Sequence, residues 1–284
     1  GTVAKAGGWT RIRADVEQIL IEGGRAVGVR MKDGEEIRAA QVISCAGVRS
    51  TIEHLLPEAI TRDPWARSIT SLKAGPAHLC LYLGFTGDIT TAGASAANKW
   101  FYETWSPEDE TWDMEPGNVG RATCLYTSFP SLKDPEHDPG PDVRHTGEVV
   151  TFVPWDAFKR WAGTEWHERG ADYDAFKKDI EEAMLAQFFE NMPQLRPMLD
   201  YVELSTPLST DHFCRPTAGS IYGLEPSPER FENPWLRPKT PIKGLYFGGS
   251  EVTSVGVIGA MMGGVLAATA AAPRDVAKYM KGIG

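Results

Sequence analysis

Residues 244–272 read GLYFGGSEVTSVGVIGAMMGGVLAATAAA, and most of the structural interpretation of this chain depends on them. It begins as a short strand (GLYFGG), passes through a turn (SEVTS) and continues as a helix rich in glycine and alanine (VGVIGAMMGGVLAATAAA). No residue from Val252 to Ala272 carries a charge. The segment is therefore either a membrane span or a helix packed inside a globular protein.

The length of the uncharged segment suits a membrane span, because a bilayer core needs roughly 20 apolar residues in a helix. Its composition favours a protein interior instead. Gly256, Gly259, Gly263 and Gly264 fall inside the expected helix, and each glycine costs about 1 kcal/mol relative to alanine in a water-soluble helix. Such a helix can approach a strand or a ligand closely, and its first N–H groups attract negative charge. We expect a slender helix buried in protein; a membrane anchor formed by Val252–Ala272 is the alternative.

The overall composition is that of a globular protein with one or two domains. The chain has 284 residues, 42% apolar and 24% charged, and a formal net charge of -9. This negative charge argues against nucleic acid as a partner, because proteins bind nucleic acid through clustered lysine and arginine. The cysteines are widely spaced and form no CxxC or Cys/His motif, so neither a metal site nor a disulfide framework is expected.

The first residues, GTVAKAGGWTRIRADVEQ, contain no apolar core of a signal peptide. The sequence starts abruptly, with a helix-like segment that runs straight into a strand, so we expect that the beginning of the protein is missing. We expect a cytoplasmic location, and peripheral contact with a membrane stays open.

Residues 9–47 predict a β-meander. Apolar residues alternate in part along QILIE and RAVGVRM, which is the period of a half-buried strand. Gly23-Gly24 and Asp33-Gly34 separate the runs and suit tight turns. We expect three strands, of which the last, QVISCAG, is fully buried and ends at Gly47.

Residues 51–240 predict a mixed α+β insertion between two pieces of another domain. Most of the tryptophans lie here, among polar loops, and HLCLYLGF and RATCLYTSF read as strands. DYDAFKKDIEEAMLAQFFENMP reads as an amphipathic helix, capped by Asp172 and stopped by Pro193. Its apolar side comprises Tyr173, Phe176, Ile180, Met184 and Phe188.

The order of these segments resembles a superfamily of FAD-dependent oxidoreductases. FGGSEVT followed by VGVIGAMMGG is similar to the C-terminal flavin-binding segment of amine oxidases and phytoene desaturases, and the meander followed by AAQVISCAG is similar to their second FAD-domain segment. The stretches WAGTEWHERGADYDAFKKDI, LSTPLSTDHFCRPTAGSIYGLEPSPERF and LRPKTPIKGLYFGGSEVTSVGVIGAMMGG resemble the retinol saturase and carotenoid isomerase branch. The sequence lacks the GxGxxG motif that opens such enzymes. The resemblance therefore implies a C-terminal half whose N-terminal half is missing.

The resemblance implies an α/β fold, with a partial FAD/NAD(P)-binding (glutathione-reductase-like) domain that includes the β-meander, plus a mixed α+β substrate domain. It assigns residues 1–50 and 241–284 to the FAD-binding domain and residues 51–240 to the substrate domain. FAD is the implied cofactor. The reductant is not assigned, and NAD(P)H is one candidate. The implied substrate is a conjugated, lipophilic polyene such as a carotenoid or retinoid. Saturation, desaturation and isomerisation all fit hydride exchange with flavin N5.

The resemblance also implies cofactor-binding positions in three groups: strand positions near the adenine and dinucleotide, the acid that contacts the ribityl chain with its neighbours, and the turn that faces the flavin. The groups are Val16 and Gly47; Gly249, Ser250 and Glu251; and Gly256, Val257, Ile258 and Gly259.

Each of these positions has a plain structural alternative. Glu251 suits the positive end of a helix dipole, and Ser250 suits a helix N-cap. Val16 is equally expected as a buried valine, and Gly47 as a turn at a strand end. The glycines of the last helix are also expected wherever a helix packs tightly on a sheet.

No catalytic residue is assigned. Asp211, His212 and Tyr222 lie in the stretch that resembles the substrate side, where a general acid is conceivable, but a structural histidine is expected more often. Some aromatic residues of the middle segment could line a tunnel for a polyene, but we expect most of them to form the core or helix–sheet contacts: Trp100, Phe101, Trp105, Trp155, Phe158 and Trp161. The alternatives for the whole protein are an FAD-dependent amine oxidase-like enzyme and a non-catalytic, truncated remnant or interaction module.

Overall fold

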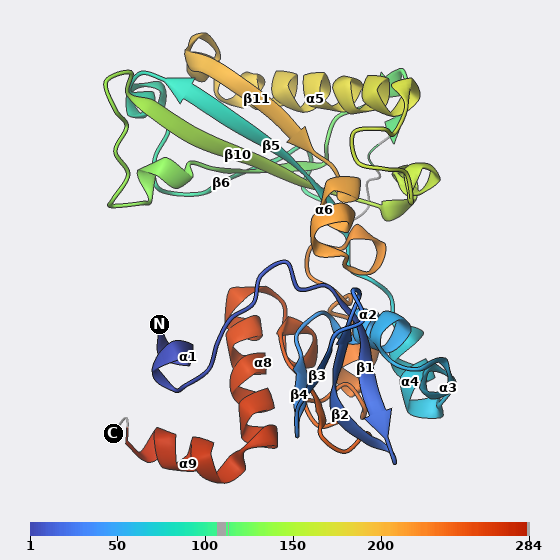
Figure 1. Cartoon of the computed structure of the whole chain (residues 1–284). Helices are drawn as coiled ribbons and strands as arrows, with labels where there is room; N and C mark the ends of the chain where they lie inside the picture. Colours follow the sequence, from blue (N-terminus) through green and yellow to red (C-terminus); the bar gives the residue numbers. More distant parts are fainter. Residues whose placement is uncertain (107–111, 113, 283–284) are drawn as a thin grey trace. The chain divides into compact units, whose positions relative to one another are not determined.

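The computed structural model describes residues 1–106, 112 and 114–282 of the chain. The chain divides into two compact units, whose elements are labelled in Figure 1. Unit 1 consists of Gly1–Gly75 together with the C-terminal segment that starts at Tyr222, and unit 2 consists of Pro76–Ile221. Residues 51–75 and 222–240, which the sequence assigns to the substrate domain, thus lie in unit 1.

Two backbone hydrogen bonds mark the points where the chain passes from one unit to the other. In unit 1, the Gly75 N–H donates to the Gly223 carbonyl at 2.7 Å. In unit 2, the Ile221 N–H donates to the Pro76 carbonyl at 3.1 Å. The outgoing and the returning chain therefore run side by side within each unit.

Unit 1 is built from short elements of both chain segments. The first segment contributes α1 (Thr2–Lys5), β1 (Val16–Glu22), β2 (Arg25–Met31), β3 (Glu36–Arg38), β4 (Val42–Ser44), α2 (Val48–Ser50), the π-helical turn η1 (Thr51–Leu55), α3 (Glu58–Thr61) and α4 (Pro64–Thr70). The second contributes α7 (Pro228–Glu232), β12 (Leu245–Phe247), the 3-10 turn η9 (Ser250–Val252), α8 (Gly256–Ala271) and α9 (Pro273–Lys281).

The predicted meander is confirmed, with one correction. β1, β2 and β3 form an antiparallel sheet in that order, with Gly23-Gly24 between the first two strands and Asp33-Gly34 between the last two. The third strand is Glu36–Arg38, however, and not QVISCAG. QVISCAG lies beyond the meander and contains β4.

β4 pairs in parallel with β12, so that Ile43 lies opposite Tyr246. The Val42 N–H donates to the Gly244 carbonyl, and the Gly248 N–H donates to the Ser44 carbonyl, both at 2.8 Å. The prediction of a fully buried strand is wrong, since Ile43 is 45% exposed. The backbone of β4 bonds a distant part of the chain, and a local sequence pattern cannot reveal such a partner.

One hydrophobic cluster holds the two segments of unit 1 together. Ile19, Ile52 and Trp65 come from the first segment, and Leu236 and Phe247 come from the second. Because all of them are buried, the N-terminal meander and the C-terminal strand share a single core.

α8 begins and ends within one residue of the predicted helix. It is buried only along a line of small residues, Gly259, Gly263 and Ala267. The expected burial of this helix is therefore limited to one side in this chain, because six large apolar residues on the rest of α8 are 41% to 76% exposed. They are Val257, Ile258, Met261, Met262, Val265 and Leu266.

The alternative of a membrane anchor concerns α8 and the helix that follows it, α9. Within the residues that the structure describes, no single helix has the length and apolar character needed to cross a membrane. α8 and α9 together pass on length and composition alone, and they are bent by 120° at the break between them. The segment Val252–Ala272 is not one continuous helix, since α8 starts only at Gly256.

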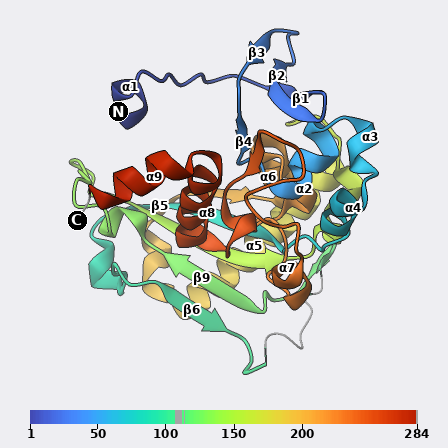
Figure 2. The same ribbon diagram turned by 90° about the horizontal axis from the view of Figure 1, so that it is seen from below.

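Unit 2 is a five-stranded sheet with a long helix. Its strands are β5 (Ala77–Thr86), β6 (Lys99–Tyr102), β9 (Cys124–Ser128), β10 (Arg144–Val153) and β11 (Leu199–Ser205), in the order β11-β5-β10-β9-β6. Strands were predicted at β5 and β9, and both are confirmed. The remaining helices are α5 (Ala171–Asn191) and α6 (Pro207–Cys214), and a small hairpin joins β7 (Met114–Glu115) to β8 (Asn118–Val119). Figure 2 shows β9 and β6 side by side.

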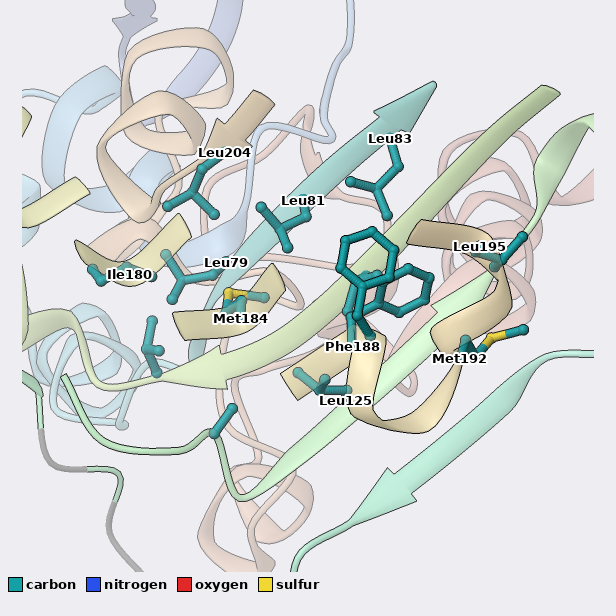
Figure 3. Close-up of a cluster of buried hydrophobic side chains, with 14 of the residues drawn as sticks. Leu79, Leu81, Leu83, Leu125, Ile180, Met184, Phe188, Met192, Leu195 and Leu204 are labelled. Atoms are coloured by element: carbon teal, nitrogen blue, oxygen red, sulfur yellow. The ribbon is translucent and has the colours of Figure 1, made fainter. Parts of the chain in front are cut away.

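The core of unit 2 lies between the sheet and α5. Leu79, Leu81 and Leu83 of β5 point toward the helix, where Met184 and Phe188 meet them (Figure 3). The five apolar positions predicted for the inner side of α5 are all buried. One face of the sheet is thus filled by helix side chains, and the other is not covered by α5.

The ends of α5 differ in part from the prediction. The helix stops at Asn191, before Pro193, as expected. Its N-cap is Gly170 rather than Asp172. The Asp172 carboxylate instead accepts a hydrogen bond from the Trp161 indole N–H at 2.9 Å, so a tertiary contact replaces the expected cap.

Candidate functional site

Glu251 is the predicted cofactor-binding residue whose buried side chain bonds two distant parts of the backbone. It lies in η9 between β12 and α8, and it is only 7% exposed. One carboxylate oxygen accepts a hydrogen bond from the Leu224 N–H at 2.9 Å, and the other accepts one from the Val48 N–H. The side chain therefore ties together three distant parts of unit 1. Since a carboxylate can accept about four hydrogen bonds, acceptor positions remain for a ligand.

Two glycines with positive φ lie beside this carboxylate, and one of them, Gly223, leaves the space that the carboxylate occupies. Gly223 has a φ of +74°, and a Cβ there would lie 2.3 Å from the Glu251 carboxylate. Gly47 has a φ of +84°, and a Cβ there would lie 3.7 Å from the second carboxylate oxygen. Gly47 thus does end the β4 region with a turn beside Glu251, and Gly223 is a residue of the site that the sequence analysis did not identify.

The loop before α8 packs against the helix through glycine. A Cβ on Gly263 would lie 1.9 Å from the Gly249 carbonyl oxygen, and a Cβ on Gly259 would lie 1.7 Å from that of Ser254. The Thr253 hydroxyl donates to the Gly259 carbonyl at 2.6 Å. Tight packing therefore explains Gly259, and it also fixes Gly249 on the helix surface.

The first turn of α8 is open. Its N-cap is Val255, no side chain caps it, and its first turn contains no acidic residue. Val257 and Ile258 are 76% and 72% exposed, and a Cβ on Gly256 would meet nothing within 4 Å. The alternative of Ser250 as the N-cap of this helix is wrong, because the chain makes a separate 3-10 turn at Ser250 before α8 begins.

Val16 stands apart from these residues. It is the first residue of β1, pairs with Met31 and is partly buried. Among the described hydrogen bonds, those of Glu251 involve Val48 and Leu224 and none involves Val16. The structure thus brings Gly47, Gly249 and Glu251 to one end of β4 and β12, whereas Val16 lies in the meander.

The sheet face of unit 2 that is turned away from α5 carries a row of aromatic side chains. Trp100 lies opposite Tyr126 in the strand register, and their ring centroids are 4.9 Å apart. Tyr102 stacks on Trp100 with a centroid distance of 6.0 Å. Trp100 and Tyr102 are 48% and 54% exposed, and a hollow of about 560 Å³ lies beside them, lined by Tyr102, Glu103, Thr104 and Trp105.

The same face continues onto β5 with three polar groups, of which Cys80 is buried, His78 is partly buried and Tyr82 is 43% exposed. Burial raises the pKa of the Cys80 thiol to about 12, and mainly burial raises the pKa of Tyr82 to about 12. Burial lowers the pKa of His78, and its Nδ1 has no hydrogen-bond partner among the described residues. His78 was not singled out from the sequence, because a histidine in a strand carries no motif.

Most of the aromatic residues proposed for a tunnel belong to the core. Phe158 and Trp161 are buried against α5, while Phe101 and Trp155 pack partly against the same cluster. Only Trp100 and Trp105 are largely exposed. The expectation that most of these residues form the core is confirmed.

Two of the candidate general acids, Asp211 and His212, lie in α6 of unit 2, and the third, Tyr222, lies in unit 1. His212 lies in α6, with its ring 4.7 Å from that of Trp166. Its neighbour Asp211 has a pKa raised by burial, a shift that Arg169 and His212 oppose. Tyr222 belongs to unit 1 and is 39% exposed. Aromatic packing accounts for His212, and the acid role stays a prediction.

Comparison with known proteins defines the class of this fold and site. The family model described as flavin containing amine oxidoreductase matches residues 2–272. The chain therefore belongs to that family.

The relatives lie in the branch that the sequence resembles. The chain is 30% identical to an all-trans-retinol 13,14-reductase of Danio rerio over 276 residues, covering 92% of this chain and 45% of the relative. It is 27% identical to a neurosporene-forming phytoene desaturase of Rhodobacter capsulatus, covering 87% and 46%. A solved oxidoreductase from Methanosarcina mazei has a similar fold, with a TM-score of 0.59, 19% identity and coverage of 92% and 50%. The chain spans about half the length of the relatives that it matches.

The residues at the end of β4 and β12 fit a flavin cofactor. Glu251 is a buried carboxylate with acceptor capacity left, and the amides that open α8 have no side-chain cap. Gly249 has a φ of +94° with no atom within 4 Å of an added Cβ, so the backbone there is open to a ligand. A negatively polarised ring edge would be stabilised at such a helix start.

Proposed function

We propose that this chain is the C-terminal half of an FAD-dependent oxidoreductase that acts on a conjugated, lipophilic polyene. Unit 1 holds FAD as part of a glutathione-reductase-like domain, and unit 2 binds the substrate. The observation that carries the proposal is the buried Glu251 carboxylate next to the uncapped first turn of α8. The family match supports the cofactor, and the names of the relatives support the class of substrate.

In this proposal, Gly249, Ser250 and Glu251 contact the ribityl chain, and the amides of Gly256–Gly259 face the ring. Val16 and Gly47 contribute backbone contacts to the adenosine end. When bound, FAD supplies the hydride chemistry, and the protein supplies position and electrostatics. The α8 amides stabilise negative charge at the ring edge, because the positive end of the helix dipole lies there.

Unit 2 supplies an apolar surface for the polyene. The row formed by Trp100, Tyr102 and Tyr126 offers flat rings on which a conjugated chain can lie. The adjoining hollow of about 560 Å³ falls within the range of about 300–1,000 Å³ typical of small-molecule sites. The core aromatics are unavailable for this role, since α5 covers them.

The missing N-terminal half is the proposed partner of unit 1. β4 and β12 form a sheet of only two parallel strands among the described residues, whereas parallel sheets are normally larger and covered on both faces. Beside it, α8 exposes six large apolar residues. We propose that the N-terminal half extends this sheet and covers α8, and that it carries the GxGxxG motif.

The test uses the full-length protein with added FAD under anaerobic conditions. All-trans-retinol is offered to the reduced protein, phytoene to the oxidised protein and benzylamine to the oxidised protein, and the visible flavin absorbance is followed. We expect a polyene to change the flavin spectrum and benzylamine to leave it unchanged. A response to benzylamine alone would identify an amine oxidase, and a colourless protein that binds no FAD would support the non-catalytic alternative.

We also propose NAD(P)H as the reductant. The test adds NAD(P)H to the oxidised protein, and we expect the absorbance near the visible flavin maximum to fall. A cytoplasmic location with peripheral membrane contact suits a lipophilic substrate. Sedimentation of the full-length protein with neutral lipid vesicles tests that contact.

A further inference from the structure

Arg230 is a buried charge in unit 1 that neither the sequence motifs nor the proposed function explain. It lies in α7, and its residue is 1% exposed. Burial lowers the pKa of Arg230, and the Glu251 carboxylate opposes this shift. Its Nε has no hydrogen-bond partner among the described residues. Burying an incompletely bonded guanidinium costs stability. The position of Arg230 is therefore better explained by the way it fixes the neighbouring backbone than by packing.

The two terminal nitrogens of Arg230 bind two backbone carbonyls near Glu251, one from a distant segment and one from the preceding residue. One donates to the Leu224 carbonyl, and the other donates to the Ser250 carbonyl at 2.7 Å. Leu224 is also the residue whose N–H donates to the Glu251 carboxylate at 2.9 Å. The carbonyl of Ser250 belongs to the peptide that carries Glu251. Arg230 therefore fixes both the donor to the carboxylate and the backbone from which the carboxylate extends.

We propose that Arg230 is a positioning residue for the cofactor edge of unit 1. It holds Leu224 and the Ser250–Glu251 peptide in place, so that the Glu251 carboxylate stays where the proposed function needs it for FAD. This inference rests on the proposed function, and it adds a residue that acts through Glu251. Lysine cannot replace it fully, because a single ammonium lacks the planar fork that spans two separate carbonyls.

The test is a double-mutant cycle in the full-length protein, with the FAD dissociation constant measured by titration of the apoprotein. The variants are Arg230→Met, Glu251→Gln and the two combined. We expect Arg230→Met to raise the dissociation constant about tenfold, which corresponds to the loss of one charge-assisted hydrogen bond. The combined variant should be no weaker than Glu251→Gln alone, because coupled residues are not additive. Additive effects, or an Arg230→Met value within about twofold of the parent, overturn the inference.

A matched control and a conservative variant separate positioning from folding. Arg237 is exposed on the same segment and donates to the carbonyls of Leu236 and Phe231, so Arg237→Met should leave the dissociation constant unchanged. Arg230→Lys should give an intermediate value, and it decides the case if Arg230→Met does not fold. Equal values for Arg230→Lys and the parent overturn the inference. Failure of the parent to bind FAD overturns the proposed function as well, whereas an additive cycle in a parent that binds FAD overturns only the role of Arg230.

Discussion

Val48 and Glu251 are 203 residues apart in the chain, and the N–H of Val48 donates a hydrogen bond to the Glu251 carboxylate. This bond joins the turn after β4 to the turn before α8. It closes unit 1 at the position where two strands from opposite ends of the chain lie side by side. Loss of the carboxylate should therefore affect the fold and the cofactor site together.

The first prediction concerns Glu251→Ala. The amides of Val48 and Leu224 lose their acceptor in a buried region, so the free energy of unfolding should fall by about 2–4 kcal/mol. FAD affinity of the full-length protein should fall as well. Chemical denaturation and FAD titration measure the two effects. Glu251→Gln keeps one acceptor oxygen and should lose less stability, and an unchanged FAD dissociation constant in Glu251→Ala would remove Glu251 from the cofactor site.

The second prediction compares two glycines with the same backbone conformation. Gly223 and Gly24 both have a φ of +74°, but a Cβ would lie 2.3 Å from the Glu251 carboxylate at Gly223 and would meet nothing within 4 Å at Gly24. Gly24→Ala should cost about 1–2 kcal/mol, from the left-handed conformation alone. Gly223→Ala should cost about 2–5 kcal/mol, because overlap is added to that strain. Equal thermal midpoints for the two variants would contradict the close packing of Gly223 against the Glu251 carboxylate.

The third prediction compares adjacent glycines in α8. A Cβ on Gly263 would lie 1.9 Å from the Gly249 carbonyl, whereas a Cβ on Gly264 would meet nothing within 4 Å. Gly264→Ala should raise the free energy of unfolding by about 1 kcal/mol, because alanine favours the helix. Gly263→Ala should lower it and displace the loop that leads to Glu251. Urea denaturation measures both, and stabilisation by both substitutions would mean that the loop does not pack on the helix.

The fourth prediction concerns the pH dependence of unit 2. Burial raises the pKa of Cys80 from 9.0 to about 12, so the folded state keeps a proton that the unfolded state loses above pH 9. Stability is therefore fully present below pH 9 and falls as the pH rises toward 12. Thermal midpoints measured from pH 7 to pH 11 should decline, and Cys80→Ala should flatten that decline. An identical decline in Cys80→Ala would assign it to other groups, of which Tyr82 is the first candidate.

The fifth prediction concerns the exposed side of α8. Met261 in α8 and Met280 in α9 are 64% and 58% exposed. A charge at Met261 should prevent association with the separately expressed N-terminal half, because the charge would be buried in an apolar contact. Met280→Glu is the matched control and should associate normally. Association is measured by co-purification of the two halves, and normal assembly of Met261→Glu would show that the N-terminal half does not cover α8.

The sequence predicted the elements well where the pattern is local. The α5 helix, the strands β5 and β9 and the bounds of α8 follow from periodicity and from glycine and proline signals. The family was predicted from an ordered set of motifs, and the family match over residues 2–272 confirms it.

Long-range partners could not be predicted in this way. The pairing of β4 with β12 depends on a strand near the other end of the chain. The same holds for Asp172, which bonds Trp161 instead of capping its helix. Burial of Arg230 leaves no local mark either, because an arginine in PSPERFENP reads as an ordinary surface residue. Periodicity reports the environment of one element, and these features arise only when separate elements meet.

The chain leaves unit 1 after Gly75 and returns at Tyr222. Backbone hydrogen bonds join the outgoing and the returning segment in each unit. A module whose ends are neighbours can be transplanted as a cassette. Exchange of Pro76–Ile221 for the equivalent segment of a relative should therefore alter the proposed substrate-binding unit and leave the proposed FAD site of unit 1 intact.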